Sequence, residues 1–327
     1  MTYLLTSLER SYVNSMDGLT LSEKINAYKG MTCRNIKVFF KDKMTVFFSI
    51  LAPLIVFLLY ILFLRDTYLS SMEHSLESVS SLVNMKDVEN IANGWLLSGI
   101  LASSCVTVSL NSLTVMVDDK DRKVDYDYNS SPSNGHIVVL SYFTGALVNT
   151  LLITFGVLTA GLIVLSIGGS LYLTVTKVLL LYLVTILGCA SGTLLMMVIA
   201  SFFKKAGALG AFGGIVSAAI GFIIGAYVPL GNFSNGVQTA LSFVPGSHVA
   251  AIYRDILMSG PTVHVANAMG SNGGAEFLES IREDFSLSLT MFDYKATQLF
   301  SFMFIVGSII VGLILNIVLY KKASKRK

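Results

Sequence analysis

The chain has 327 residues, of which 54% are hydrophobic and only 13% are charged, and its mean hydropathy is +0.70. A typical soluble domain carries about 25% charged residues, and a chain of this size buries at most about three quarters of its surface on folding. The composition therefore excludes soluble, disordered and fibrous proteins and predicts an integral membrane protein, and the net charge of +3 gives no reason to expect a nucleic-acid partner.

The first 43 residues are predicted to form a cytoplasmic segment that ends in a helix. Met1–Val13 contains two charges and no apolar core, so we do not expect a cleaved signal peptide. Thr20 and Glu23 have the spacing of a capping box, which predicts a helix start at Thr20. Beyond it, cations share one helical face and apolar residues another: the cations are Arg34, Lys37 and Lys41, and the apolar residues are Ile36, Phe39, Phe40 and Met44. Such a helix is expected to lie flat at the lipid headgroups, although ordinary positive-inside flanking charge would give the same pattern.

Six uncharged stretches between residues 44 and 320 are long enough to cross a bilayer core about 30 Å thick. The expected spans are Thr45–Leu64, Trp95–Val117, 144–167, Val178–Phe203, Ala206–Leu230 and Ala296–Tyr320. The third span is the inner part of a longer uncharged stretch, Ile137–Ile167. The sequence thus predicts an all-α membrane protein with six transmembrane helices, preceded by an amphipathic interfacial helix.

The distribution of cations predicts the orientation. Of the 23 Lys and Arg residues, 17 lie in segments that six spans place on one face, namely 1–43, 118–136, 204–205 and 321–327. Cytoplasmic segments carry the excess of Lys and Arg. We therefore expect both termini, including the basic tail 321–327, in the cytoplasm, and 65–94 and 231–295 as outer segments.

No pattern of catalytic, cofactor-binding or metal-ligating residues occurs. The four histidines lack partners at metal-ligand spacing, and three widely spaced cysteines give neither a disulfide framework nor a zinc site; these residues are His74, His136, His248, His264, Cys33, Cys105 and Cys189. The sequence also has no glycine-rich phosphate loop of the ATPase type. We therefore expect that the chain is not an enzyme and does not itself bind ATP.

The predicted spans contain no Asp, Glu, Arg or His. Ion-coupled transporters usually need such groups inside the membrane, although some sodium sites use only carbonyls and hydroxyls. The absence favours a transporter whose energy comes from another chain. An ion-coupled transporter or channel, and a membrane subunit for immunity or sensing that does not transport, remain alternatives.

The fifth predicted span is rich in glycine at intervals of four residues. Such spacing lets membrane helices approach closely. We expect Gly210, Gly214, Gly221 and Gly225 to pack within the bundle or at a dimer interface, although glycine is common in membrane helices in any case.

Three segments resemble the membrane subunits of type-2 ABC exporters. The first is the basic stretch 34–43, which is followed by an early proline in 47–54. The second is 118–128, a segment with eight charges among eleven residues between two spans, followed by Ser131-Pro132. The third is 243–257, which contains Pro245 and resembles the short helices before the last span of that family.

The resemblance implies specific roles and partners. It makes 34–41 an interfacial elbow helix, with Arg34, Lys37, Phe39, Phe40 and Lys41. It makes the segment after the second span a loop that couples to an ATPase, through Asp118, Asp119, Lys120, Asp121, Arg122, Lys123 and Tyr126. The implied partners are a P-loop ATPase subunit that holds ATP and magnesium, a second permease subunit of the same or another kind, the lipid membrane and an unidentified exported substrate such as a drug, lipid or polysaccharide. The expected location is a bacterial plasma membrane.

Overall fold

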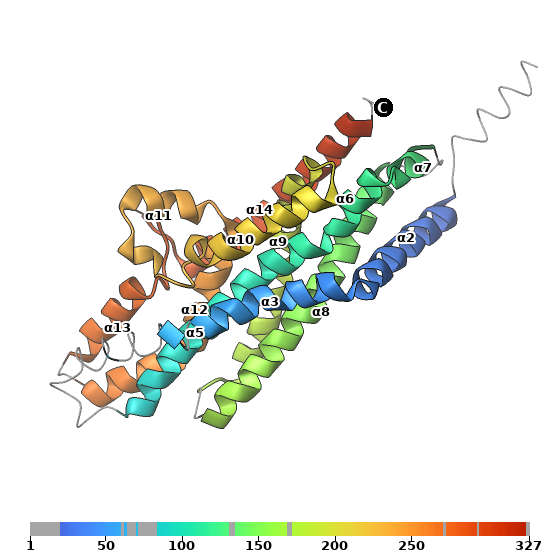
Figure 1. The fold of residues 1–327 in the computed structure, drawn as a ribbon. Helices are drawn as coiled ribbons and strands as arrows, with labels where there is room; N and C mark the ends of the chain where they lie inside the picture. The colour runs from blue at the N-terminus through green and yellow to red at the C-terminus, as the bar shows by residue number, and fades with distance from the viewer. Residues whose placement is uncertain are drawn as a thin grey trace, which may run out of the picture.

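The computed structural model describes residues 20–59, 62–63, 70, 84–130, 135–168, 172–270, 273–292 and 294–324. These residues form a helical bundle with one two-stranded hairpin (Figure 1). The longer elements are α2 (Leu21–Lys41), α3 (Lys43–Leu59), α5 (Met85–Ser112), α8 (Gly135–Gly168), α9 (Val175–Ser201), α10 (Ala206–Ile223), α12 (Pro245–Met269) and α14 (Gln298–Ser324). The shorter elements are α6 (Thr114–Asp121), α7 (Val124–Ser130), η3 (Leu230–Asn232), α11 (Asn235–Ser242), α13 (Gly274–Asp284), β1 (Thr290–Met291) and β2 (Tyr294–Lys295).

Some predicted features lie outside the described residues. These are the stretch Met1–Val13, Ser131-Pro132, most of the outer segment 65–94 and the last residues of the tail, 325–327.

Within the part of the chain that the structure describes, five helices have the length and hydropathy of a membrane span, which supports an all-α membrane protein. They are α5 continued by α6, then α8, α9, α10 and α14. A sixth span arises if α2 and α3, which meet at 77°, count as one broken span. The described part of α3 has 17 residues and contains Pro53.

The predicted start of α2 is confirmed. The Thr20 hydroxyl accepts a hydrogen bond from the Glu23 backbone N–H, and the Glu23 carboxylate accepts one from the Thr20 N–H at 2.8 Å. Both backbone donors at the open end of the helix are therefore satisfied locally. The helix ends at Lys41, and Asp42 forms its C-cap.

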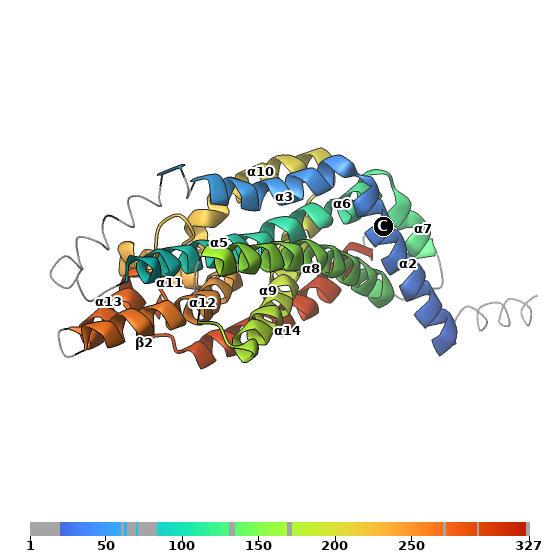
Figure 2. The same ribbon diagram turned by 90° about the horizontal axis from the view of Figure 1, so that it is seen from below.

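The helix α5 is the centre of the bundle. It begins at Met85, ten residues before the predicted span. In the most apolar 18-residue stretch of α5 and α6, 89% is buried inside the protein. It packs against α12, α8, α3 and α9, and Figure 2 shows it lying between α3 on one side and α12 on the other. Because α5 is covered by other helices, little of it is exposed to lipid, and it can contain many serine residues. The hydroxyls of these buried serines donate to carbonyls of the same helix; they include Ser98, Ser103, Ser104 and Ser109.

The segment before the last span differs from the expectation of short helices. The helix α11 has 8 residues, but α12 has 25 and packs along α5, α9 and α14. It begins with Pro245 in its first turn. Proline fits there because the backbone N–H groups of the first turn have no acceptor within the helix, so the missing N–H costs no hydrogen bond. Its hydropathy is lower than that of the predicted spans, and its surface is covered mainly by other helices of the chain.

The helix α10 is shorter than predicted, which corrects the role of two glycines. It ends at Ile223, and Gly225 follows with φ +73°, so Gly225 lies in a turn rather than on a helix face. A Cβ on Gly221 would lie 2.3 Å from the ring of Tyr227, so this glycine makes room for the turn that follows the helix. The predicted packing face is therefore wrong for Gly225.

The other two glycines of α10 do not pack within the described bundle. A Cβ added to Gly210 or Gly214 would meet no atom within 4 Å. Packing inside the bundle is thus contradicted for this pair. A role at a dimer interface stays a prediction.

A close helix approach through small residues occurs instead between α5 and α9. A Cβ on Gly192 would lie 2.5 Å from the carbonyl oxygen of Cys105, and one on Gly188 would lie 3.1 Å from the Cys105 sulfur. The Cys105 and Cys189 sulfurs lie 3.6 Å apart in the same contact. The spacing of Gly188 and Gly192 is the small-residue pattern of membrane helix contacts, and we had applied this pattern only to α10.

The bundle has two ends, which we name after a short helix at each. The C-terminus, α6 and α7 lie at the α7 end, and α13 and the start of α5 lie at the α13 end (Figure 1).

Candidate functional site

The segment predicted as a coupling loop is helical. It comprises the last turn of α6 and all of α7, which are joined at Lys123 with φ +62°. The Arg122 guanidinium donates to the Asp118 carboxylate at 3.0 Å, one helical turn away. Such a pair supports a helix, which explains why a strongly charged sequence does not form an open loop here.

Asp119 lies in the interior rather than on the surface. Its carboxylate binds Arg34 of α2 through both oxygens, with Arg34 Nη2 2.6 Å from Asp119 Oδ1. The Tyr142 hydroxyl of α8 donates to Asp119 Oδ2 at 2.6 Å. A two-pronged guanidinium–carboxylate pair is among the strongest side-chain contacts and fixes geometry as well as charge. Buried Asp119 and Tyr142, together with the partly exposed Arg34, join α2, α6 and α8; we call these three residues the Asp119 cluster.

The helix α7 packs against the Tyr142 ring of this cluster. The ring of Tyr128 packs edge-on against Tyr142, with ring centroids 6.5 Å apart. Burial raises the pKa of the Tyr128 phenol above its usual value. The group therefore stays neutral at physiological pH and adds no charge beside Asp119.

The helix α2 packs on α8 with one face. The Tyr28 hydroxyl donates to Thr144 at 2.8 Å, and a Cβ on Gly145 would lie 2.9 Å from the Cβ of Asn35. Phe39 is buried in this contact. The expected elbow residues therefore divide: Arg34 and Phe39 face protein, which corrects their assignment to the headgroups, whereas Lys37, Phe40 and Lys41 are exposed.

Lys120 and Asp121 hold the turn between α9 and α10. The Lys120 ammonium donates to the carbonyl of Ser201 at the end of α9, at 3.2 Å. The Asp121 carboxylate accepts from the backbone N–H of Ala206 at the start of α10, at 3.2 Å. A cation at a helix C-terminus and an anion at an N-terminus both complement the helix dipole. These two side chains therefore face their own bundle, although we had assigned them to contact a partner.

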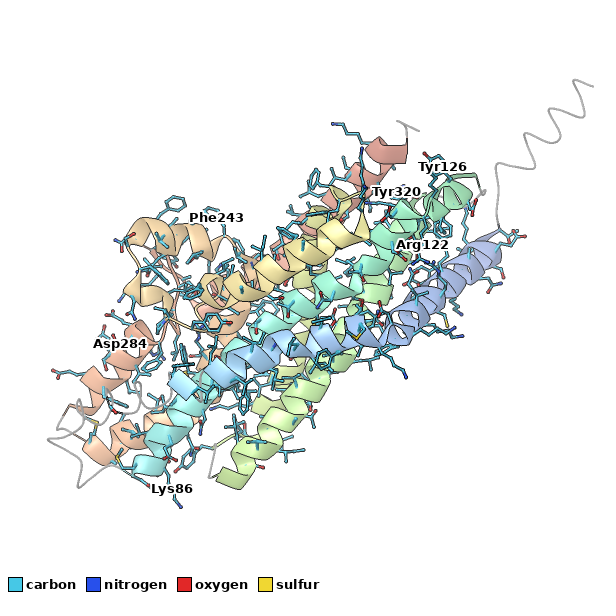
Figure 3. The ribbon with its side chains drawn as sticks, in the orientation of Figure 1. Lys86, Arg122, Tyr126, Phe243, Asp284 and Tyr320 are labelled. Carbon is cyan, nitrogen blue, oxygen red and sulfur yellow. The ribbon has the colours of Figure 1, made fainter. Side chains whose placement is uncertain are left out.

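The rest of the segment faces outward. Arg122, Lys123 and Tyr126 are exposed, and Figure 3 shows Arg122 and Tyr126 at the α7 end. The exposed surface of this segment thus carries Arg122, Lys123, Tyr126 and the carboxylate of Asp127, on a helix end that is fixed to four other helices.

The α13 end contains a second set of buried polar groups. Arg254 of α12 is fully buried and donates to the carbonyls of Ile224, Gly225 and Ser286, at 2.9, 2.7 and 3.2 Å. Two of these carbonyls follow α10, where a helix lacks intrahelical donors. Arg254 thereby fixes the end of α10 to α12.

His248 of the same helix is also buried. Its Nε2 lies 2.8 Å from the carbonyl of Ser242, its Nδ1 lies 3.0 Å from the Ser301 hydroxyl, and its ring stacks on Phe304. A carbonyl only accepts, so Nε2 carries the proton and Nδ1 accepts from Ser301. Burial lowers the pKa of His248 to about 4, so the ring is neutral at physiological pH. His248 and Arg254 both lie in the segment 243–257, which resembles the ABC exporter subunits. The sequence did not indicate their hydrogen-bond partners, because these lie far away along the chain or in the backbone.

A third polar contact lies nearer the tip of the α13 end. Buried Asp87 of α5 accepts from the Tyr172 hydroxyl at 3.1 Å and binds His264 Nδ1 of α12 at 2.7 Å. The rings of Tyr172 and His264 stack with centroids 4.8 Å apart. Within the described ranges, no three His, Cys, Asp or Glu side chains come close enough to hold a metal ion.

Comparison with known families identifies the chain. The sequence model described as "ABC-2 family transporter protein" matches residues 69–320, which is more than half of the chain and covers α5 to α14. A search of curated proteins gave no match. The match confirms the resemblance to type-2 ABC transporter permeases and makes the chain a membrane transport component rather than an ATPase. The chain therefore belongs to the ABC-2 family of transporter proteins.

Proposed function

We propose that this chain is the permease subunit of an ATP-driven exporter and that the exposed end of α6 and α7 binds its ATPase. The ATPase would hold ATP and magnesium, and this chain would hold no cofactor. A second permease subunit would complete the transport path, as a homodimer or a heterodimer. The substrate class is not part of the proposal.

The contacts that Asp119, Lys120 and Asp121 make with other helices are the observation that carries this proposal. Asp119, Lys120 and Asp121 are consecutive residues, and they bind α2, α8, α9 and α10. A movement imposed on the exposed side chains beyond them would therefore reach four helices at once. An ordinary solvated turn has no need of such fixation.

The orientation is part of the same proposal. Most of the cations lie in segments at the α7 end and in the basic tail, which favours a cytoplasmic location of that end. The ATPase would then bind where ATP is available. We expect a bacterial plasma membrane, with both termini in the cytoplasm.

The test uses a variant that changes only the exposed side chains, Arg122→Glu, Lys123→Glu and Tyr126→Ala together. Exposed single ion pairs contribute about 0–1 kcal/mol, whereas tyrosine and arginine often dominate interfaces. We therefore expect the triple variant to insert normally but to co-purify with less ATPase and to lose stimulation of ATP hydrolysis in vesicles.

The matched control is Lys321→Glu with Lys322→Glu, which makes the same charge reversal at exposed positions of α14 at the same end. It should bind the ATPase as the unmodified chain does. Normal association and hydrolysis in the triple variant would show that the ATPase does not bind this surface. Equal losses in both variants would indicate a general charge effect and also contradict the proposal.

A further inference from the structure

Four exposed aromatic side chains form two edge-to-face pairs at the α13 end, and each pair includes a residue of the β1–β2 hairpin. Phe243 follows α11, Phe292 lies at the tip of the β1–β2 hairpin, Tyr294 is in β2 and Phe300 is in the first turn of α14. Phe292 is 74% exposed and Tyr294 is 54% exposed. The rings of Phe243 and Phe292, and those of Tyr294 and Phe300, lie 6.1 Å apart in edge-to-face pairs. We call these four residues the aromatic anchor.

The hairpin separates this group from a charged hollow. Thr290 pairs with Lys295 across the strands, and Met291 pairs with Tyr294. Successive side chains of a strand point to opposite faces, so Lys295 and Tyr294 point to different sides. Lys295 and Thr290 line a hollow of about 540 Å³, together with acidic and basic side chains of α13.

The hollow has the character of a surface that faces water. Lys295 forms an ion pair with Glu283, and both side chains are more than half exposed. Arg282 and Glu279 of α13 line the same hollow. Figure 3 shows Phe243 projecting from the outside of α11, well away from Asp284 on α13. Charged and aromatic side chains therefore occupy different sides of this part of the molecule.

The tip of the hairpin is held in a conformation that exposes its aromatic ring. Phe292 has φ +48°, in the left-handed region that bulky residues rarely adopt. Its backbone N–H donates to the Thr239 hydroxyl of α11 at 3.1 Å, which fixes the tip. In water, both the backbone conformation and the exposed ring are unfavourable. At a lipid interface, the ring would gain the burial that the protein does not supply.

The aromatic anchor is continuous with a surface that faces lipid. The hairpin ends at Lys295, and α14 begins at Gln298. In the first turns of α14, which is a membrane span, Leu299 and Met303 are exposed to the surroundings of the bundle. The anchor therefore lies at the level where this span enters the bilayer. Tyrosine favours this level because its ring joins an apolar body to a polar hydroxyl, and phenylalanine side chains bury their apolar rings at the boundary between headgroups and acyl chains in interfacial segments.

We propose that the aromatic anchor seats in the lipid headgroup layer at the α13 end and sets the depth of the hairpin and α11 in the membrane. The depth is that of the headgroups rather than the hydrocarbon, because Lys295 directly follows Tyr294 and forms an ion pair with Glu283, and charged groups are costly in hydrocarbon. The inference rests on the membrane location of the chain and not on its binding of an ATPase or on which end is cytoplasmic.

The test is tryptophan fluorescence in vesicles whose lipids carry bromine near the headgroup end of the acyl chains. The chain has one tryptophan, Trp95, which is buried, so the signal of the unmodified chain gives a constant background. The full chain with Phe292→Trp is expected to show additional emission at short wavelength, to lose most of it in brominated lipid and to lose little of it to aqueous iodide. Phe243→Trp serves as a second probe of the same surface, so one misfolded variant does not decide the test.

The control probe is Glu279→Trp on the charged hollow. It should show the opposite pattern, with strong iodide quenching and little effect of brominated lipid. Strong iodide quenching at Phe292→Trp and Phe243→Trp would overturn the proposal, because the anchor would then face water. Protection from both quenchers would also overturn it, because protein rather than lipid would then cover the anchor.

Discussion

At the α7 end a buried carboxylate is neutralised by a guanidinium, whereas at the α13 end a buried guanidinium is held by backbone carbonyls. Asp119 binds Arg34 and Tyr142, which come from two other helices. Arg254 binds the carbonyls of Ile224, Gly225 and Ser286. Side-chain partners can change with a rotamer, but backbone carbonyls cannot leave without unfolding their segment. The comparison shows that α2, α6 and α8 are joined through side chains alone, whereas α12 is joined to the end of α10 through backbone carbonyls.

The largest effect is expected from Arg254→Met. The variant leaves three carbonyls at the α13 end without their donor, and an unsatisfied buried polar group costs about 1–3 kcal/mol. Because methionine recovers some packing, we expect the free energy of unfolding in detergent to fall by about 4 kcal/mol. Thermal unfolding of the purified chain measures this loss. Arg282→Met, at an exposed position, is the control and should leave the midpoint unchanged; an equal midpoint for both variants would contradict a structural role of Arg254.

A smaller and asymmetric effect is expected at the Asp119 cluster. Arg34→Met leaves a buried carboxylate without its cation and should cost about 3 kcal/mol. Asp119→Asn should cost only about 1 kcal/mol, because the Tyr142 hydroxyl can still donate to the amide oxygen and Arg34 is partly exposed to solvent.

Combining the two changes gives the sharper measurement. The double variant Arg34→Met with Asp119→Asn should be more stable than Arg34→Met alone, since the uncompensated charge has been removed. Thermal unfolding of all four chains supplies the cycle. Strict additivity would mean that the two side chains are not coupled in the folded chain, which would remove the joint on which the proposed coupling depends.

A further effect, smaller than those of Arg254→Met and Arg34→Met, is expected from pH through His248 at the α13 end. His248 has a pKa of about 4 in the folded chain and about 6.5 when unfolded. The unfolded chain therefore binds the proton more readily, and stability is lost as the pH falls from 6.5 towards 4. By pH 5.5 the loss should be about 1.4 kcal/mol. Thermal unfolding between pH 7.5 and 5.5 measures it.

His248→Gln is the control for this pH dependence. Glutamine can still donate to the Ser242 carbonyl but does not titrate. The variant should start from a lower stability and change less with pH than the unmodified chain does. Parallel pH profiles for the two chains would show that His248 is not the group responsible.

Several features of the fold follow from local sequence and were predicted correctly. The capping box at Thr20 and Glu23 specifies the start of α2 because both of its hydrogen bonds are made within four residues. Long uncharged stretches specify the membrane helices because a bilayer requires apolar length and satisfied backbone groups. Low charge and high hydropathy established the protein class, and the order of segments indicated the family.

Other features were beyond the sequence because they depend on partners far along the chain. The cationic face of α2 and the acidic end of α6 were predicted to have separate roles. The ion pair between Arg34 and Asp119 was not predicted, because the two residues are 85 positions apart in the sequence. The length of α12 and its packing along α5, α9 and α14 were not predicted, because hydropathy detects exposure to lipid and α12 is covered mainly by protein.

The glycines show the same division between local pattern and tertiary contact. Spacing at four residues marks Gly210 with Gly214 and Gly188 with Gly192 equally well, but only the second pair meets a neighbouring helix in the described chain. The sequence by itself determined that this protein is a helical membrane transporter component, because composition and apolar length act residue by residue. Only the tertiary structure decided which charges pair, which glycines pack and which aromatic rings remain exposed, because each of these depends on what the fold places within a few ångströms.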